Sequence, residues 1–163
     1  ETTAAAAGQV GVIRRDPMAM LPFCGYNMGD YFAHWLEVGK KLKHPPKIFS
    51  VNWFRTDDAG KFMWPGFGDN IRVIKWIIDR VQGKAASRET ALGLLPELND
   101  LDLSGLNISR EALEKLFEID PSQWSAELQE IEKYLLQFGS HTPEAIWKEY
   151  RSLAEKLRLP CNK

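Results

Sequence analysis

The sequence has few cysteines and almost no net charge, and both shortages limit what kind of protein it can be. Its two cysteines, Cys24 and Cys161, lie far apart, so we expect reduced thiols in a cytoplasmic protein rather than a disulfide. The formal net charge is −1, from 21 Lys+Arg and 22 Asp+Glu. No apolar run approaches the roughly 20 residues that span a bilayer. We therefore expect neither nucleic acid nor membrane as a partner.

Recognisable catalytic and metal-binding motifs are also missing. The chain contains neither GxxxxGK[ST] nor GxGxxG, the glycine-rich patterns that bind phosphates. Its three histidines, His34, His44 and His141, share no metal-ligand spacing with one another or with the cysteines. The adjacent carboxylates of Asp57 and Asp58, in "TDDAG", are typical of a hairpin turn rather than of an acid/base pair. Local patterns thus predict no complete catalytic apparatus and no metal site.

The start of the chain indicates a fragment. The first residues, "ETTAAAAGQVG", lack the basic start and apolar block of a signal peptide. They do not begin with Met, and four alanines run into Gly8. We expect a cut inside a flexible loop of a longer protein. Hydrophobic residues make up 44% of the chain, enough to bury a core.

Hydrophobic periodicity predicts an α/β fold whose last third is helical. Short β-branched or alternating runs predict strands at 10–16, 47–53 and 89–96. Apolar residues at helical spacing predict helices over 31–42, capped by Asp30, and 69–83, with a stripe of Ile71, Ile74, Ile78 and Val81. Capping signals predict three further helices, which begin after Ser109, Asp120 and Thr142. We expect the helices to pack beside the mixed α/β part.

Residues 51–70, "VNWFRTDDAGKFMWPGFGDN", form an aromatic loop in which five large rings lie among turn-forming residues. The rings belong to Trp53, Phe54, Phe62, Trp64 and Phe67. Under one interpretation the rings fix the loop to the core, which suits Trp53 at a strand end and extends to Trp64. Under the other, two Phe rings form a slot for a planar ligand such as a purine base. Stacking on such a ring contributes about 1–3 kcal/mol per base.

The residues that follow the rings suit the second interpretation. The glycines of "PGFG" allow a ligand to approach the backbone closely. The side-chain amide of Asn70 carries both an acceptor and donors, so it can meet the mixed hydrogen-bonding edge of guanine. From the residues alone, both interpretations of the aromatic loop remain open.

Longer motifs carry a family resemblance. "MLPFCGYNMGDYFAHWL" and "PKIFSVNWFRTDDAGKFMWPGFGDNIRVIKW" resemble the C-terminal part of GTP-dependent phosphoenolpyruvate carboxykinase, closely over about residues 1–83. The later "GLN", "ALEKLFEID", "QW" and "EIEKYLL" follow the closing helices of that family in order. The resemblance implies conversion of oxaloacetate and GTP to phosphoenolpyruvate, carbon dioxide and GDP. It also implies Mn²⁺ and Mg²⁺ in the intact enzyme, with ligands outside this chain, and a cytoplasmic monomer of gluconeogenesis.

The resemblance also implies roles for individual residues. Phe54, Phe62 and Phe67 would form the guanine pocket, with Phe54 and Phe67 on its two faces. Gly68, Asp69 and Asn70 would contact the nucleotide, and Asn70 would read the base.

The same resemblance implies a division of the chain. Residues 1–163 would be the C-terminal part of the nucleotide-binding domain: a remnant of the active-site lid at 1–11, an α/β part at 12–96 and a helical tail at 97–163. The remnant includes Thr3, Ala4, Ala5 and Ala6. Ala7-Gly8-Gln9 stands where many members carry charged residues. With the phosphate loop and metal ligands absent, we expect the fragment alone to be inactive.

Two alternatives of other classes stand beside the carboxykinase. An aromatic groove could bind single-stranded RNA or a proline-rich peptide, although the near-neutral charge argues against RNA. The chain could also be a purely structural helical accessory domain.

Overall fold

The computed structural model describes residues 20–160, which divide into two compact units. The first unit consists of residues 20–45 and 120–160, and the second of residues 46–119. The predicted strand at 10–16, the lid remnant with Thr3, Ala4, Ala5 and Ala6, and Cys161 lie outside the described residues. Cys24 is a free thiol.

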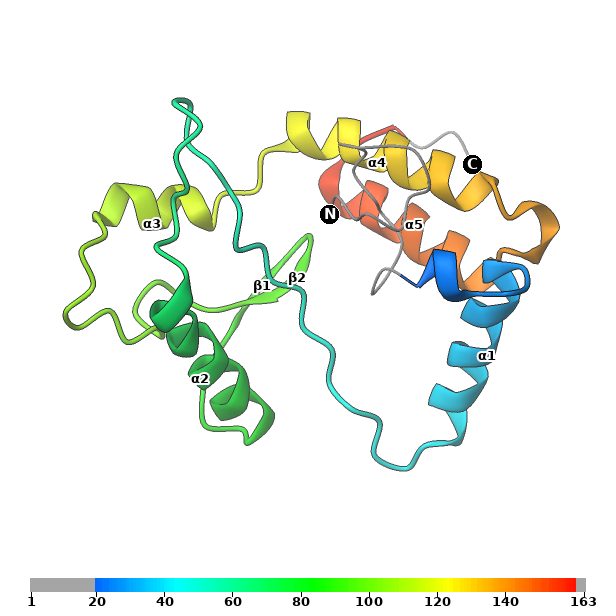
Figure 1. Cartoon of the computed structure of the whole chain (residues 1–163), viewed down its shortest axis with the longest axis horizontal. Helices are drawn as coiled ribbons and strands as arrows, with labels where there is room; N and C mark the ends of the chain where they lie inside the picture. Colours follow the sequence, from blue (N-terminus) through cyan, green and yellow to red (C-terminus); the bar gives the residue numbers. More distant parts are fainter. Residues whose placement is uncertain (1–19, 161–163) are drawn as a thin grey trace. The chain divides into compact units, whose positions relative to one another are not determined.

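The first unit is built from three helices, α1 (Met28–Lys41), α4 (Pro121–Leu136) and α5 (Glu144–Leu157). Helices α4 and α5 lie side by side (Figure 1). The short 3₁₀ turn η2 (Leu21–Phe23) precedes α1 in sequence, and a second one, η4 (Gly139–His141), precedes α5. The buried side chains of this unit are those of Met28, Phe32, Leu128, Leu135, Phe138, Thr142, Trp147, Tyr150, Ala154 and Leu157. Leu128 and Leu135 on α4, like Tyr150 and Leu157 on α5, are two helical turns apart, so each pair shares one face of its helix.

The helix starts of the first unit follow the capping signals at α4 but not at α1 or α5. Helix α5 has Pro143 rather than Thr142 at its N-cap, and the Thr142 hydroxyl donates to Leu135 O at 2.8 Å instead. Asp120 accepts from Ser122 N, as predicted, and Pro121 occupies the first turn of α4. Helix α1 instead begins earlier than expected, because Asn27 Oδ1 accepts from Gly29 N at 2.8 Å. The prediction that Asp30 caps this helix is therefore wrong.

Asp30 and Asn27 both connect the start of α1 to the segment between α4 and α5. Asp30 Oδ1 lies 2.8 Å from His141 Nδ1, and Asn27 Nδ2 donates to Phe138 O at 3.3 Å. Gly29 lies so close to this segment that a Cβ atom would be 2.6 Å from the carbonyl of His141. Because glycine has no Cβ atom, it allows α1 to pack directly against the backbone of His141.

The second unit contains the helices α2 (Asn70–Val81) and α3 (Arg110–Leu116), the 3₁₀ turn η3 (Phe67–Asp69) and one small sheet. The sheet is an antiparallel hairpin of β1 (Arg88–Thr90) and β2 (Gly93–Leu95), drawn in light green in Figure 1. Ser109 caps α3 as predicted, since its hydroxyl accepts from Ala112 N. The buried side chains of this unit are Trp64, Trp76, Leu101 and Leu113.

Two strand predictions need correction. Residues 47–53 alternate as expected but form no strand, because no backbone among the described residues pairs with them. Alternation marks two faces of a segment, whereas a strand also needs a hydrogen-bonded neighbour. The predicted strand at 89–96 is instead split by a turn into β1, which begins at Arg88, and β2. The described chain is thus a mixed fold, helices with one small sheet, consistent with part of an α/β domain.

Helix α2 is amphipathic as predicted, but its apolar stripe faces away from the described core. Ile71, Ile74, Ile78 and Val81 are all exposed, whereas Trp76 on the same helix is buried and contacts the ring of Phe49 edge-on. Within residues 20–160, no helix combines the length and apolar character needed to cross a membrane.

We predict that Gly29→Ala destabilises the first unit by about 1–3 kcal/mol, because the added methyl group overpacks against the backbone of His141. Gly39→Ala, on the same helix, is the matched control. No atom lies within 4 Å of its added Cβ, and alanine favours a helix over glycine by about 1 kcal/mol. Urea unfolding followed by circular dichroism measures both. Equal midpoints for the two variants would contradict the close approach.

Candidate functional site

The first half of the aromatic loop is a tight hairpin closed by Asp57. Its carboxylate Oδ1 accepts from Ala59 N at 3.0 Å and from Lys61 N at 2.9 Å. Thr56 and Phe62 face each other across the hairpin as a single antiparallel bridge. The turn predicted for the adjacent aspartates is therefore confirmed.

Arg55 ties this hairpin to the end of α3. Its Nη1 donates to Leu116 O and to Glu118 O, each at 3.1 Å. A cation beside the last carbonyls of a helix is favourable, because those groups carry the negative end of the helix dipole. The partners lie 61 and 63 residues away, so no local pattern could have revealed this contact.

Arg72 fixes the second half of the loop, where it enters α2. Its Nε lies 3.0 Å from Asp69 Oδ1, and its Nη2 donates to Ser104 O at 3.0 Å. Its Nη1 donates to the carbonyl oxygen of Asp102. The Ser104 hydroxyl and backbone N–H, and then the charge of Arg72, lower the pKa of the Asp102 carboxyl below its ordinary value. Asp69, predicted to contact the nucleotide, thus has its carboxylate in an ion pair.

The rings of the aromatic loop separate into a buried one and several exposed ones. Trp64 is only 5% exposed, while Trp53 is half-buried. Phe54, Phe62 and Phe67 are 68%, 59% and 96% exposed. The buried indole fixes the loop to the core, as the first interpretation supposed. The three Phe rings do not pack in the core, so that interpretation does not explain them.

The exposed rings are arranged unequally. Phe54 and Phe62 contact each other, with ring centroids 5.9 Å apart and planes at 61°. Among residues 20–160, no ring contact of Phe67 is found. The placement of Phe54 and Phe67 on the two faces of a base stays a prediction.

The backbone around Phe67 has an unusual conformation. Gly66 has φ 77° and ψ −167°, and Phe67 itself has φ 46°. The first conformation is accessible essentially to glycine alone, and the second is uncommon for a residue with a side chain. Gly68, the next residue, has no atom within 4 Å of an added Cβ. The backbone therefore turns the Phe67 ring outward and leaves open space beside it.

Asn70 begins α2, and its amide has a defined partner. The indole Nε1 of Trp64 donates to Asn70 Oδ1 at 2.9 Å. Asn70 is half-buried, so one edge of the amide is bound while the group stays accessible. Sequence reasoning missed this bond, because nothing in a six-residue spacing across a turn indicates that the two side chains meet.

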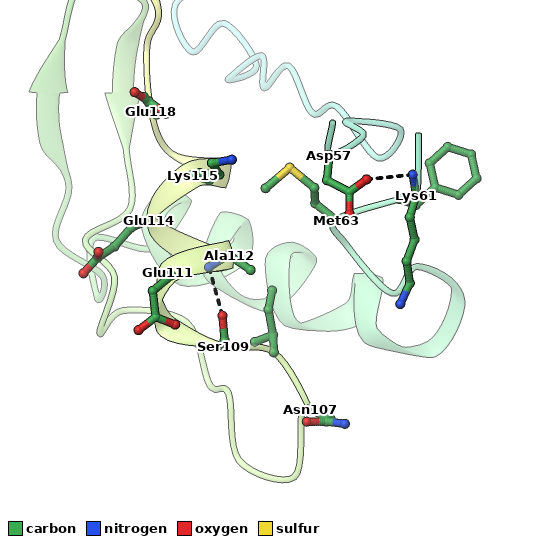
Figure 2. A pocket seen from close by; sticks show the side chains of 12 residues that line it. Asp57, Lys61, Met63, Asn107, Ser109, Glu111, Ala112, Glu114, Lys115 and Glu118 are labelled. Carbon is green, nitrogen blue, oxygen red and sulfur yellow. Dashed lines mark hydrogen bonds between the residues drawn. The ribbon is translucent and has the colours of Figure 1, made fainter. Parts of the chain in front are cut away.

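A hollow of about 670 Å³ lies beside the aromatic loop, between its hairpin and α3. Figure 2 shows Asp57, Lys61 and Met63 on the hairpin side and Glu111, Glu114 and Lys115 on the helix side.

This hollow suits a nucleotide poorly. Of the exposed Phe rings of the aromatic loop, only Phe62 lines it. Its carboxylates, those of Asp57, Glu111, Glu114 and Glu118, outnumber its two ammonium groups, those of Lys61 and Lys115, and the net negative charge would repel phosphates. The pKa of Glu111 is lowered by hydrogen bonds from its own backbone N–H and then from Ser109.

Within residues 20–160, no cluster of three His, Cys, Asp or Glu side chains could hold a metal ion. The described residues therefore do not fit the divalent metals that the resemblance implies for the intact enzyme.

Comparison with known proteins gives one consistent family. The model of the phosphoenolpyruvate carboxykinase C-terminal P-loop domain matches residues 1–156. The chain is 49% identical over 158 residues to phosphoenolpyruvate carboxykinase [GTP] of Anaeromyxobacter dehalogenans (strain 2CP-1), and 52% identical over 159 residues to the proteins of that name from Arthrobacter sp. (strain FB24) and Thermoplasma volcanium. These matches cover 97%, 96% and 98% of this chain but 26% of each relative. The chain thus spans about a quarter of the length of these curated relatives.

We predict that Gly66→Ala distorts the loop, whereas Gly68→Ala does not. Alanine at the Gly66 backbone angles is strained by about 1–3 kcal/mol. Gly68 is two residues away, does not have a positive φ and has free space around it. Unfolding free energies from denaturant titration and amide exchange of residues 64–70 would measure the difference. If both variants match the unsubstituted chain, the backbone at Gly66 is not constrained.

Proposed function

Because the chain belongs to the GTP-dependent phosphoenolpyruvate carboxykinase family, we propose that it is the guanine-binding part of such an enzyme. That enzyme converts oxaloacetate and GTP to phosphoenolpyruvate, carbon dioxide and GDP, a reaction of gluconeogenesis. The alternative of a groove for single-stranded RNA or a proline-rich peptide has no support from the family match. We propose a cytoplasmic monomer, in line with the expectations from sequence.

The observation that carries the proposal is the exposure of three Phe rings on a loop that is otherwise firmly attached. When a planar ligand covers large apolar rings that were exposed to water, the apolar surface is buried and the free energy falls. The loop is held by Arg55, Arg72 and the buried Trp64. A ligand therefore meets rings whose backbone is already ordered, which reduces the entropy lost on binding.

Each candidate residue then has a role that its environment supports. Phe54 and Phe67 stack on the two faces of the guanine base, and Phe62, in contact with Phe54, supports that ring from the side. The open space beside Gly68 lets the nucleotide approach the backbone. The ion pair of Asp69 with Arg72 orients the start of α2, so we assign Asp69 a nucleotide contact through its backbone. Asn70 reads the base.

The remaining chemistry of phosphoryl transfer would come from elsewhere in the enzyme. Such transfer depends on positioning and on neutralisation of charge by metal ions and basic side chains. In the relatives, about three quarters of the chain lies outside the matched region. We propose that the ligands of Mn²⁺ and Mg²⁺ lie there, and that residues 1–11, including Thr3, Ala4, Ala5 and Ala6, belong to a lid over the active site.

We predict that Phe67→Ala, introduced into the full-length enzyme, weakens GTP binding by roughly 5- to 150-fold. That range corresponds to the loss of one stacking face, about 1–3 kcal/mol. Oxaloacetate binding should stay nearly unchanged, because the ring touches only the base. Titration with each substrate measures both affinities, and Phe23→Ala, an exposed ring of the first unit, is the control. An unchanged GTP affinity in folded Phe67→Ala would exclude the slot.

We further predict that residues 1–163 alone have no carboxykinase activity and bind GTP weakly at best. Stacking supplies about 1–3 kcal/mol, while association costs an estimated 4–15 kcal/mol. The phosphate contacts that would close this gap have no motif in the sequence. Calorimetry with GTP, run beside the full-length enzyme, measures the difference. Micromolar binding by residues 1–163 would mean that the aromatic loop is a self-sufficient site.

A further inference from the structure

We propose that Trp64 is a positioning residue that decides which edge of the Asn70 amide faces the base. This inference rests on the proposed function, since it concerns how the guanine-binding loop distinguishes one purine from another. Its starting point is the 2.9 Å hydrogen bond from Trp64 Nε1 to Asn70 Oδ1.

The chemistry of the two groups fixes the orientation of the amide. An indole N–H is a donor only, so the atom that it meets must be the amide oxygen and not the amide nitrogen. A carboxamide is planar, and its oxygen and nitrogen lie on opposite edges. With Oδ1 turned toward Trp64, the NH₂ group of Asn70 is turned away from the indole. It is therefore the part of this half-buried side chain that an approaching purine base would meet.

Burial makes this orientation costly to reverse. Trp64 is 5% exposed, so if the amide turned round, the indole N–H would lose its partner out of reach of water. Two N–H donors, the indole N–H and the amide NH₂, would also face each other. The neighbouring backbone is held independently, because Arg72 connects Asp69 to the carbonyl of Ser104. The side chain and the start of α2 are thus both constrained.

The exposed edge of Asn70 then selects a base by its acceptor. An amino group donates, so it pairs with a 6-oxo group, as in guanine, and opposes the 6-amino group of adenine. This refines the expectation that the amide meets a mixed edge through both of its ends. The loop with Trp64 and Asn70 accordingly recognises 6-oxopurine nucleotides through a donor.

The test compares two matched Trp→Phe variants in the full-length enzyme. Trp64→Phe keeps a ring but removes the N–H, and should lower the ratio of kcat/KM for GTP to kcat/KM for ATP by about 2- to 10-fold, the range for one neutral hydrogen bond. Trp76→Phe is the control. Its indole is also 5% exposed and lies on α2, but within residues 20–160 its Nε1 has no hydrogen-bond partner. The ratio should stay constant in this control.

A third variant tests the direction of the donor. In Asn70→Asp, one carboxylate oxygen still accepts from Trp64 while the other offers an acceptor to the base, so the preference should move toward ATP. Equal ratios in Trp64→Phe and Trp76→Phe, or an unchanged preference in Asn70→Asp, would overturn the inference. If Trp64→Phe does not fold, hydrogen exchange of the Trp64 indole N–H in the unsubstituted enzyme decides: the bond to Asn70 Oδ1 should make this exchange slow, and rapid exchange would overturn the inference. Failure of the proposed function would look different, because the unsubstituted enzyme would then show no preference for GTP.

Discussion

Trp64 combines two constraints that are usually separate, since the same indole fills the core of the second unit and hydrogen-bonds the side chain that begins α2. A buried ring cannot move without opening a cavity, and a buried N–H cannot be left without an acceptor. The indole therefore sets where the aromatic loop ends, and with it the position of Asn70 and the start of α2. This attachment fixes the end of the loop that follows the exposed Phe67 ring.

The two arginines complete this arrangement by a different physical means. Arg55 and Arg72 bind backbone carbonyls of segments far away in sequence, at the end of α3 and in the loop around Ser104. A carbonyl is present at every residue, so these contacts place few demands on the partner side chains. The loop can thus be held by charge and hydrogen bonds while its apolar rings stay exposed, which a hydrophobic attachment alone would not permit.

Most local chemistry was predictable, apart from the caps of α1 and α5, whereas long-range pairing was not. The cap at Ser109, the turn at Asp57 and the helical period of α2 follow from nearest neighbours, and the structure confirms them. The strand expected at 47–53 failed because pairing depends on a partner that the segment itself does not encode. The rings of the candidate site could be listed from sequence. Their exposure, and the bond that orients Asn70, depend on which other residues fill the core.

Phe67 shows how opposing demands can meet at one position. Its positive φ of 46° costs a residue with a side chain some conformational energy, and its ring, 96% exposed, recovers almost nothing from packing. Glycine would relax this backbone and so favour the folded chain, yet it would discard the stacking surface. Selection for stability and selection for ligand recognition therefore act in opposite directions here. A stabilising substitution at this position would be expected to impair binding, the trade-off typical of residues retained for function.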